Sequence, residues 1–160
     1  MRFSATGTDA MTELAALLER HLDAIPMVRA MQVRVGDIGA ATVRLHAPLG
    51  PNLNDKGCAF GGSLVALMTL AGWSLVEARL QSAGHAADVF VADSQVDYLA
   101  PLWDDLAADA TAADGEDWDE FLGVFAARGR ARIAIAASVP LPAGGMAARM
   151  RARYVAIARR

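Results

Sequence analysis

The feature that most constrains the fold is an uncharged stretch of 20 residues, from Gly57 to Val76. Its length matches what a helix needs to cross a bilayer. However, its first seven residues, GCAFGGS, are typical of a loop and a helix cap, and the remainder is too short to span a membrane. The pattern therefore predicts a helix that begins at Gly61 or Ser63, continues to about Gln81 and is buried inside a protein.

A helix that is apolar on nearly every side must be covered, and the rest of the sequence supplies strands to cover it. Alternating runs predict strands in AMQVRV, ATVRLHA and ADVFVADSQVDYLAPL, a return strand in DDLAADATA, and two closing strands in RARIAIAASV and AARMRARYVAIA. Helical spacing predicts an N-terminal amphipathic helix at about 9–25 and another in EDWDEFLGVFAARG. These elements indicate one α+β domain over 1–160, in which an antiparallel sheet wraps the apolar helix.

The composition favours self-association and excludes several partners. Hydrophobic residues make up 54% and charged residues 21% of the chain, so we expect a homodimer or a dimer of dimers that buries apolar surface. A net charge of −3 gives no attraction to nucleic acid. The single cysteine excludes an internal disulfide and a CxxC metal site and favours the cytoplasm. Charges interrupt the apolar pattern of the N-terminal segment, so we expect no signal peptide.

The loop before the uncharged helix carries the most specific motif. Many hot-dog thioesterases have Asn-x-x-Gly-x-x-His-Gly-Gly where a loop enters the central helix, and Asn54, Gly57, Gly61 and Gly62 fall at that spacing, with Phe60 in place of the histidine. The strings PNLNDKGCAFGGSL, LAGW and ADSQVDYLAP together resemble the thioesterase domain of the YiiD C-terminal type, found alone or behind a GNAT acetyltransferase domain. The resemblance covers roughly residues 26–158. It implies the hot-dog fold, a curved antiparallel sheet around a central helix.

Thioester hydrolysis requires donors for the oxygen that gains charge in the transition state, and backbone amides at a helix N-terminus supply such donors. Gly61 and Gly62 have no side chains, so a ligand carbonyl can approach the backbone closely. The resemblance implies that the amide near Gly62 is the oxyanion donor. The alternative is a tight turn that serves only to enter the helix.

The catalytic base is harder to assign. Related thioesterases place an acid about two turns after the paired glycines, whereas this helix has none before Glu77. We expect Asp93 to act as base or to orient water, with Asn54 positioning the water or the thioester. Regular alternation would turn Ser94 rather than Asp93 towards the apolar face, and a β-bulge would reverse that assignment.

Other residues near the motif are expected to contact substrate, and they are Asp55, Lys56, Phe60, Gly61, Ser63, Thr69 and Ser94. Asp55 is the alternative carboxylate. Lys56 would meet a pantetheine or nucleotide phosphate, or is equally a solvated loop residue. Cys58 is expected to be a small packing residue, because no histidine close in sequence would activate it.

The last strand presents three arginines on one face. Arg149, Arg151 and Arg153 are expected to form cross-strand ion pairs with acids such as Asp97, Asp105 and Asp109. A basic patch for the phosphates of coenzyme A is the alternative use.

Two functions follow from these features. The first is an acyl thioesterase that hydrolyses acyl-CoA or acyl-carrier-protein thioesters at a subunit interface, without a metal or redox cofactor. The second is a non-catalytic module that binds acyl thioesters, which the missing helix acid and histidine favour. Dehydratase or hydratase chemistry is weaker, because it typically relies on the histidine that Phe60 replaces.

Overall fold

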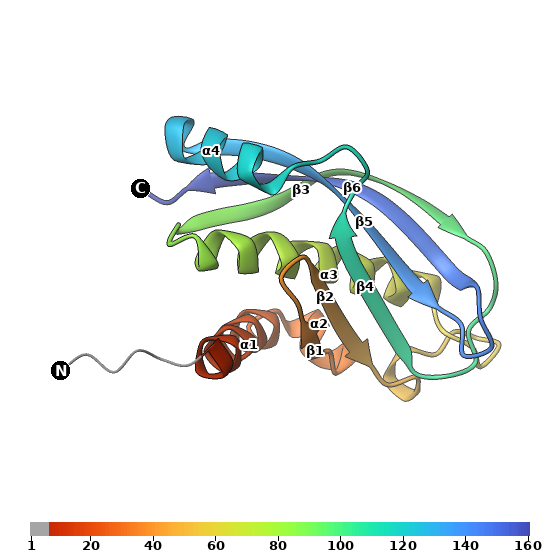
Figure 1. Cartoon of the computed structure of the whole chain (residues 1–160). Coiled ribbons are helices and arrows are strands. Elements are labelled where there is room, and N and C mark those ends of the chain that lie inside the picture. The colour runs from red at the N-terminus through yellow and green to blue at the C-terminus, as the bar shows by residue number, and fades with distance from the viewer. Residues whose placement is uncertain (1–6) are drawn as a thin grey trace.

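The computed structural model describes residues 7–160 and contains one curved sheet with a long helix against its inner face (Figure 1). The elements follow in the order α1 (Gly7–Asp23), α2 (Pro26–Met31), β1 (Arg34–Ile38), β2 (Thr42–Ala47), η1 (Gly50–Asn52), α3 (Gly61–Ser82), β3 (Ala87–Tyr98), β4 (Leu106–Ala112), α4 (Trp118–Arg128), β5 (Arg130–Pro140) and β6 (Met146–Ala158). This arrangement is the hot-dog fold, as the sequence predicted.

The six strands lie in the order β1-β2-β4-β5-β6-β3, and every neighbouring pair is antiparallel. The edges of the sheet are therefore β1 and β3. DDLAADATA does form a strand, but the prediction that it returns along the preceding strand was wrong. β4 pairs with β2 and β5, whereas β3 pairs with β6. The connection from β3 to β4 crosses the sheet, and sequence alternation carries no information on such a crossing.

The central helix α3 is buried along most of its length, because β2 to β6 all contact it. Its core-facing side chains, including those of Leu67, Met68 and Ala71, are fully buried. By length and composition alone α3 could cross a membrane, but 67% of its most apolar window lies inside the protein, as in the core helix of a globular domain. A hydroxyl from β6 anchors the helix, since Tyr154 donates a hydrogen bond to the carbonyl of Thr69 (2.7 Å).

The N-terminal region differs from the predicted pattern in one respect. The first helix ends at Asp23, and a second helix, α2, starts at Pro26. Proline suits the first position of a helix, because the N–H that it lacks would have no acceptor within the helix there. As a result, the strand predicted from AMQVRV begins only at Arg34. Pro26 thus follows the end of the first helix and also starts the next one.

The edge strand β3 contains a β-bulge between Val91 and Asp93. Residues on either side of it therefore do not share one continuous face. Val91 lies opposite Tyr154 on the helix side, and beyond the bulge Ser94 lies opposite Ala152 on that same side. Phe90, which lies opposite Val155, therefore does not share a face with Ser94 as strict alternation would require, because the extra residue shifts the alternation by one.

Candidate active site at the start of the central helix

The loop from Leu53 to Phe60 forms a closed elbow around the side chain of Asn54. Its Oδ1 accepts hydrogen bonds from the backbone N–H groups of Lys56 (2.8 Å) and Cys58 (3.2 Å), and its Nδ2 donates to Cys58 Sγ (3.1 Å). The Asn54 amide also donates to the carbonyl of Cys58 (2.8 Å). Such side-chain bonds to the local backbone are typical of asparagine in turns. The Asn54 side chain thus holds the shape of the elbow.

The elbow leads into α3, and within the described residues two backbone amides at the start of this helix donate no hydrogen bond. Phe60 is the N-cap, and its carbonyl accepts hydrogen bonds from the amides of Ser63 (2.9 Å) and Leu64 (3.1 Å). In residues 7–160 the amides of Gly61 and Gly62 have no acceptor. Both are therefore available to an anionic oxygen at the positive end of a long helix.

Aromatic rings lie directly against these two glycines. A Cβ at Gly62 would come 2.4 Å from Phe60 Cε1, and a Cβ at Gly61 would come 3.4 Å from Tyr98 Cε1. The Phe60 ring therefore requires a glycine at 62, in addition to any need for a ligand to approach. Phe60 replaces the polar histidine of the motif with a ring that packs on the helix start.

A cavity of about 340 Å³ opens beside the elbow. It is lined by Asn54, Cys58, Ala59, Gly61, Leu64, Tyr98, Leu99, Ala100, Pro101 and Ala147. The lining is mainly apolar and contains no carboxylate. This cavity can hold an apolar group next to free amides, but it supplies no base of its own.

Seven of the ten predicted site residues lie in the elbow or at the start of α3. Asn54, Phe60, Gly61, Gly62 and Ser63 lie together at the elbow, and Ser63 is buried there. Asp55 and Lys56 lie at its exposed tip and form an ion pair with each other (2.8 Å), and Cys58 is a buried packing residue.

Three other predicted residues lie outside the cavity. The Oγ1 of Thr69 donates to Met150 Sδ (3.7 Å), and Ser94 is exposed on the edge strand. Despite the bulge, Asp93 stays on the outer face of the sheet, where its Oδ1 accepts a hydrogen bond from Arg153 Nε (3.0 Å). That hydrogen bond, ahead of the charge of Arg153, lowers the pKa of Asp93. Within one chain the structure does not bring Asp93 to the elbow.

Sequence reasoning missed the aromatic and aliphatic residues that surround the elbow. Large exposed side chains gather there from separate parts of the chain, namely Leu53, Phe60, Tyr98, Leu99 and Trp103. Tyr98 is 59% and Trp103 62% exposed. Exposed apolar patches of this kind are typical of surfaces that bind another molecule. The signal was the string DYLAPLW after the long strand, but only the fold places it beside the elbow.

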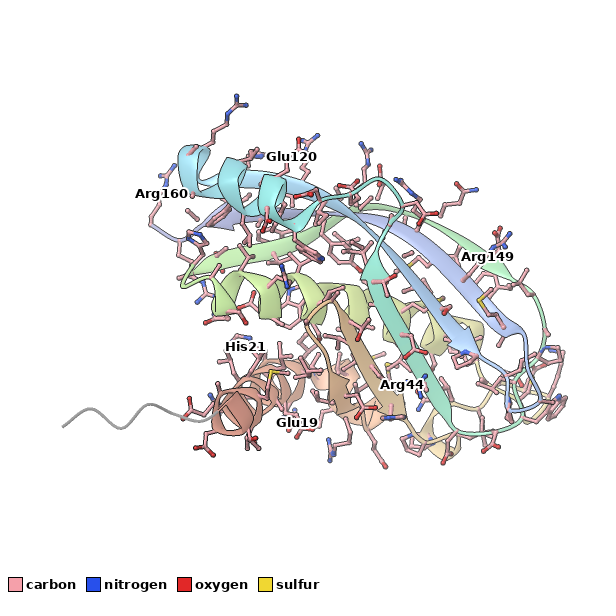
Figure 2. All side chains as sticks on the ribbon, viewed as in Figure 1. Glu19, His21, Arg44, Glu120, Arg149 and Arg160 are labelled. Atoms are coloured by element: carbon pink, nitrogen blue, oxygen red, sulfur yellow. The ribbon has the colours of Figure 1, made fainter. Side chains whose placement is uncertain are left out.

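The outer face of the sheet carries most of the ion pairs, and charged side chains such as Arg44 and Arg149 project outwards (Figure 2). Arg149 pairs with Asp97 (2.9 Å), Arg153 pairs with Asp93, and Asp109 pairs with Arg44 (2.6 Å). The expectation of cross-strand pairs is thus confirmed for Asp97. Asp109 takes a partner on β2 instead.

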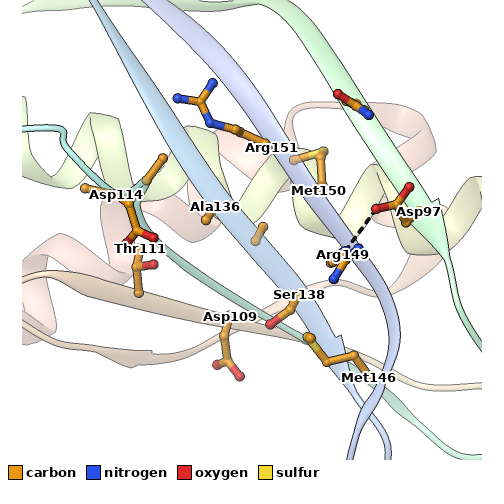
Figure 3. Close-up of a pocket in the computed structure, with 14 residues that line it drawn as sticks. Asp97, Asp109, Thr111, Asp114, Ala136, Ser138, Met146, Arg149, Met150 and Arg151 are labelled. Carbon is orange, nitrogen blue, oxygen red and sulfur yellow. Dashed lines mark hydrogen bonds and ion pairs between the residues drawn. The ribbon is translucent and has the colours of Figure 1, made fainter.

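A larger cavity, of about 590 Å³, lies on this outer face (Figure 3). It runs over small residues of β5, Ala136 and Ser138, beside the Asp97–Arg149 ion pair, and Arg151 points away from that pair. None of its lining residues lies at the elbow. Its size exceeds that of the elbow cavity, but it has no free helix amides, so we take the elbow as the candidate active site.

The chain matches known proteins over nearly all of its length. The family model described as "Putative thioesterase (yiiD_Cterm)" matches residues 13–158. A protein of Halobacterium salinarum named "Putative esterase" is 33% identical over 110 residues, which cover 66% of this chain and 72% of that protein. The residues matched by the family model include the elbow.

Solved structures resemble the whole fold. A Chlorobaculum tepidum protein of unknown function superposes with a TM-score of 0.84 at 27% identity, covering 99% of this chain and 100% of the other. The structure of a "putative thioesterase" from Shewanella oneidensis gives a TM-score of 0.82 at 26% identity, covering 92% of this chain and 99% of the other.

Proposed function

Because the chain belongs to the YiiD C-terminal thioesterase family, we propose that it hydrolyses acyl thioesters of coenzyme A or of acyl carrier protein by attack of water at an interface between two copies of the chain. The observation that carries this proposal is the pair of free amides at Gly61 and Gly62 beside an apolar cavity. The cavity would hold the acyl group. The amides would hold the carbonyl oxygen.

The proposed chemistry follows from this geometry. Water attacks the thioester carbon, and negative charge develops on the carbonyl oxygen at the N-terminus of α3. Donors that are already in place at that point stabilise the transition state more than the ground state. Among the expected residues, Gly62 acts through its amide, while Asn54 acts by holding the elbow and by lining the cavity. Asp93 is poorly placed to act as the base, because its carboxylate already pairs with Arg153, and the variant Asp93→Ala tests that role.

The interface is proposed because the site is open on one side. The elbow cavity and the exposed rings of Phe60, Tyr98 and Trp103 lie at the end of β3, a 12-residue edge strand that pairs only with β6. An unpaired edge of this length offers a row of backbone donors and acceptors to a second strand. We therefore propose a homodimer, or a dimer of dimers. The single cysteine supports a location in the cytoplasm.

The test is thiol release from acyl-CoAs of short to long chain and from acyl-carrier-protein thioesters. We expect turnover by the wild-type chain, loss of turnover in Asn54→Ala, and retained turnover in Asp93→Ala. Turnover that collapses in Asp93→Ala would restore that residue as the base. No release from any thioester on either carrier would contradict hydrolysis.

A second function is favoured by a specific observation. The elbow cavity has no carboxylate, and Phe60 occupies the position of the motif histidine. A module that binds acyl thioesters without cleaving them would need neither. Saturable binding of an acyl-CoA, with no thiol release over hours, would select this function.

A further inference from the structure

The C-terminal half of α3 contains a carboxylate, that of Glu77, which the fold does not explain. Glu77 is the only acid of this helix and is 1% exposed. In the described part of the chain its one hydrogen bond comes from a neutral group, Gln81 Nε2 (3.2 Å), and no arginine or lysine pairs with it. Burying a carboxylate without a charged partner is unfavourable, so such a residue calls for an explanation beyond the packing of the core.

Glu77 lines a cavity of about 280 Å³ that opens at the first residues of β3. His21, Trp73, Phe90 and Arg159 line the same cavity. The other titratable residues that line this cavity are His21, Asp88 and Arg159. Arg159 pairs with Asp88 (2.8 Å), and His21 contacts the Trp73 ring while its Nδ1 is buried without a hydrogen-bond partner. Figure 2 shows His21 on the side of α1 that faces α3. Within the described residues, Glu77 therefore has no cationic partner.

The two cavities lie at opposite ends of the same edge strand. α3 runs antiparallel to β3, because Gly61 lies against Tyr98 at one end, and Trp73 Nε1 donates to the carbonyl of Val89 (3.2 Å) at the other. The elbow cavity has free amides beside it and no carboxylate in its lining, whereas the cavity at the other end is lined by the Glu77 carboxylate and has no substrate-binding amides. Each end lacks what the other end supplies.

A two-fold axis between the β3 strands of two copies would bring these ends together. When two copies of an edge strand pair in antiparallel fashion, the last residues of one strand lie beside the first residues of the other. The Tyr98 end of one copy then meets the Ala87–Phe90 end of its partner, and both α3 helices stay on the same side of the continuous sheet. From this we infer that Glu77 of each copy is the general base for the elbow of the other copy. The inference rests on the proposed hydrolysis.

The step is balanced without a cofactor. The Glu77 carboxylate takes a proton from water as the water oxygen attacks the carbonyl carbon, and the amides of Gly61 and Gly62 on the other copy hold the resulting oxyanion. The intermediate then collapses, the C–S bond breaks, and the proton passes from Glu77 to the sulfur of the leaving thiolate. The products are a carboxylic acid and a thiol, and Glu77 is again ionised.

Glu77→Gln is the first variant, because glutamine keeps the acceptor for Gln81 Nε2 and nearly the same volume. We expect kcat to fall by about 100-fold or more, as for the loss of a general base, with KM little changed. The matched control is Glu116→Gln. It removes an exposed acid that lines neither cavity, and it should leave kcat unchanged. A Glu77→Gln enzyme that keeps more than a third of wild-type kcat would overturn the inference.

Complementation distinguishes action across the interface from action within one chain. Ala100→Trp fills the elbow cavity, and Glu77→Gln removes the base, so each homodimer should be inactive. A heterodimer of the two, purified through two different tags, has one intact site and should show about half of wild-type activity per dimer if the base acts on the other copy. An inactive heterodimer would mean that the base acts within one chain, and would overturn the inference.

A cross-linking test does not depend on activity. In a Cys58→Ser background, Tyr98→Cys on one copy and Val91→Cys on the other should be joined by a short bis-maleimide. Within one strand these positions are about 23 Å apart at 3.3 Å per residue, so no link forms within a chain. A cross-linked dimer that needs both substitutions supports the inference. If only monomer forms, the inference fails, even where the wild-type chain hydrolyses thioesters. If the dimer forms but no thioester is cleaved, the proposed hydrolysis fails instead.

Discussion

The elbow before α3 and the outer face of the sheet both contain many polar residues, and they use them in opposite ways. On the outer face the charged side chains satisfy one another, as in the pairs Arg149–Asp97 and Arg44–Asp109. At the elbow the Asn54 side chain satisfies the backbone of its own loop, and the groups left free are main-chain amides.

This difference shows which polar groups are available for chemistry. Charge density does not identify the site, since the face with the most ion pairs also has the larger cavity. Exposed ion pairs contribute little to stability and can be removed with small effect. The elbow has few charges, but a change there displaces the donors at the helix start. Variants of the two regions should therefore differ strongly in activity.

The largest effect is expected for Asn54→Ala. It removes the acceptor of two backbone N–H groups and the donor to Cys58 Sγ, so the elbow loses its shape. We expect a loss of about 1–3 kcal/mol in the free energy of unfolding, as for hydrogen bonds left unmade. Thiol release should fall below detection. Chemical denaturation and a thioesterase assay measure the two effects.

Asn54→Asp is the control for this variant. Aspartate keeps the acceptor for the amides of Lys56 and Cys58 but loses the donor to the thiol. It should recover most of the stability that alanine loses. If Asn54→Ala is as stable as wild type, the elbow does not depend on this side chain, and the contrast with the outer face is lost.

A smaller effect is expected for Gly62→Ala. Its Cβ would lie 2.4 Å from the Phe60 ring, which must move, whereas the Cβ of Gly61→Ala makes only a 3.4 Å contact with Tyr98. We expect kcat/KM to fall by about tenfold in Gly62→Ala, because the added methyl group crowds the amide that would hold the oxyanion. Gly61→Ala should stay within about threefold of wild type.

The double variant Phe60→Leu with Gly62→Ala sharpens this comparison. Leucine lacks the ring atoms that clash with the new Cβ, so kcat/KM should rise above that of Gly62→Ala alone. If Gly61→Ala and Gly62→Ala lose activity equally, the Phe60 ring does not determine which glycine matters.

The sequence predicted the fold well where the pattern is local. The apolar run predicted α3, and the alternation predicted the strands to within a few residues. The elbow motif placed Asn54, Gly61 and Gly62 together because they are close in the chain. These predictions depended on propensity and spacing, which a single segment carries by itself.

The rest depended on contacts between distant segments. Tyr98 lies 37 positions after Gly61 yet packs on it, and the Arg44–Asp109 pair exists because β4 adds to β2. Strand pairing of this kind is not encoded in alternation. The environment of Asp93 also depends on strand pairing. The bulge alone does not determine that Asp93 lies opposite Arg153 of β6 and pairs with it.

The smallest effect is expected for Asp93→Asn on the outer face. Hydrogen bonding to Arg153 lowers the pKa of Asp93 below its ordinary value of 3.8, so the carboxylate stabilises the folded state at any pH above that value. This contribution is lost as the pH falls through the lower pKa of the folded state. Wild type should therefore melt slightly above Asp93→Asn at pH 7, and the difference should disappear in strong acid. Because both side chains are about half exposed, high salt should also reduce it. Thermal melts at pH 7 and pH 2, with thiol release at pH 7, measure these effects. A large fall in activity without a change in melting would mean that Asp93 belongs with the elbow after all, and the contrast between the two regions would have to be redrawn around an acid on the edge strand.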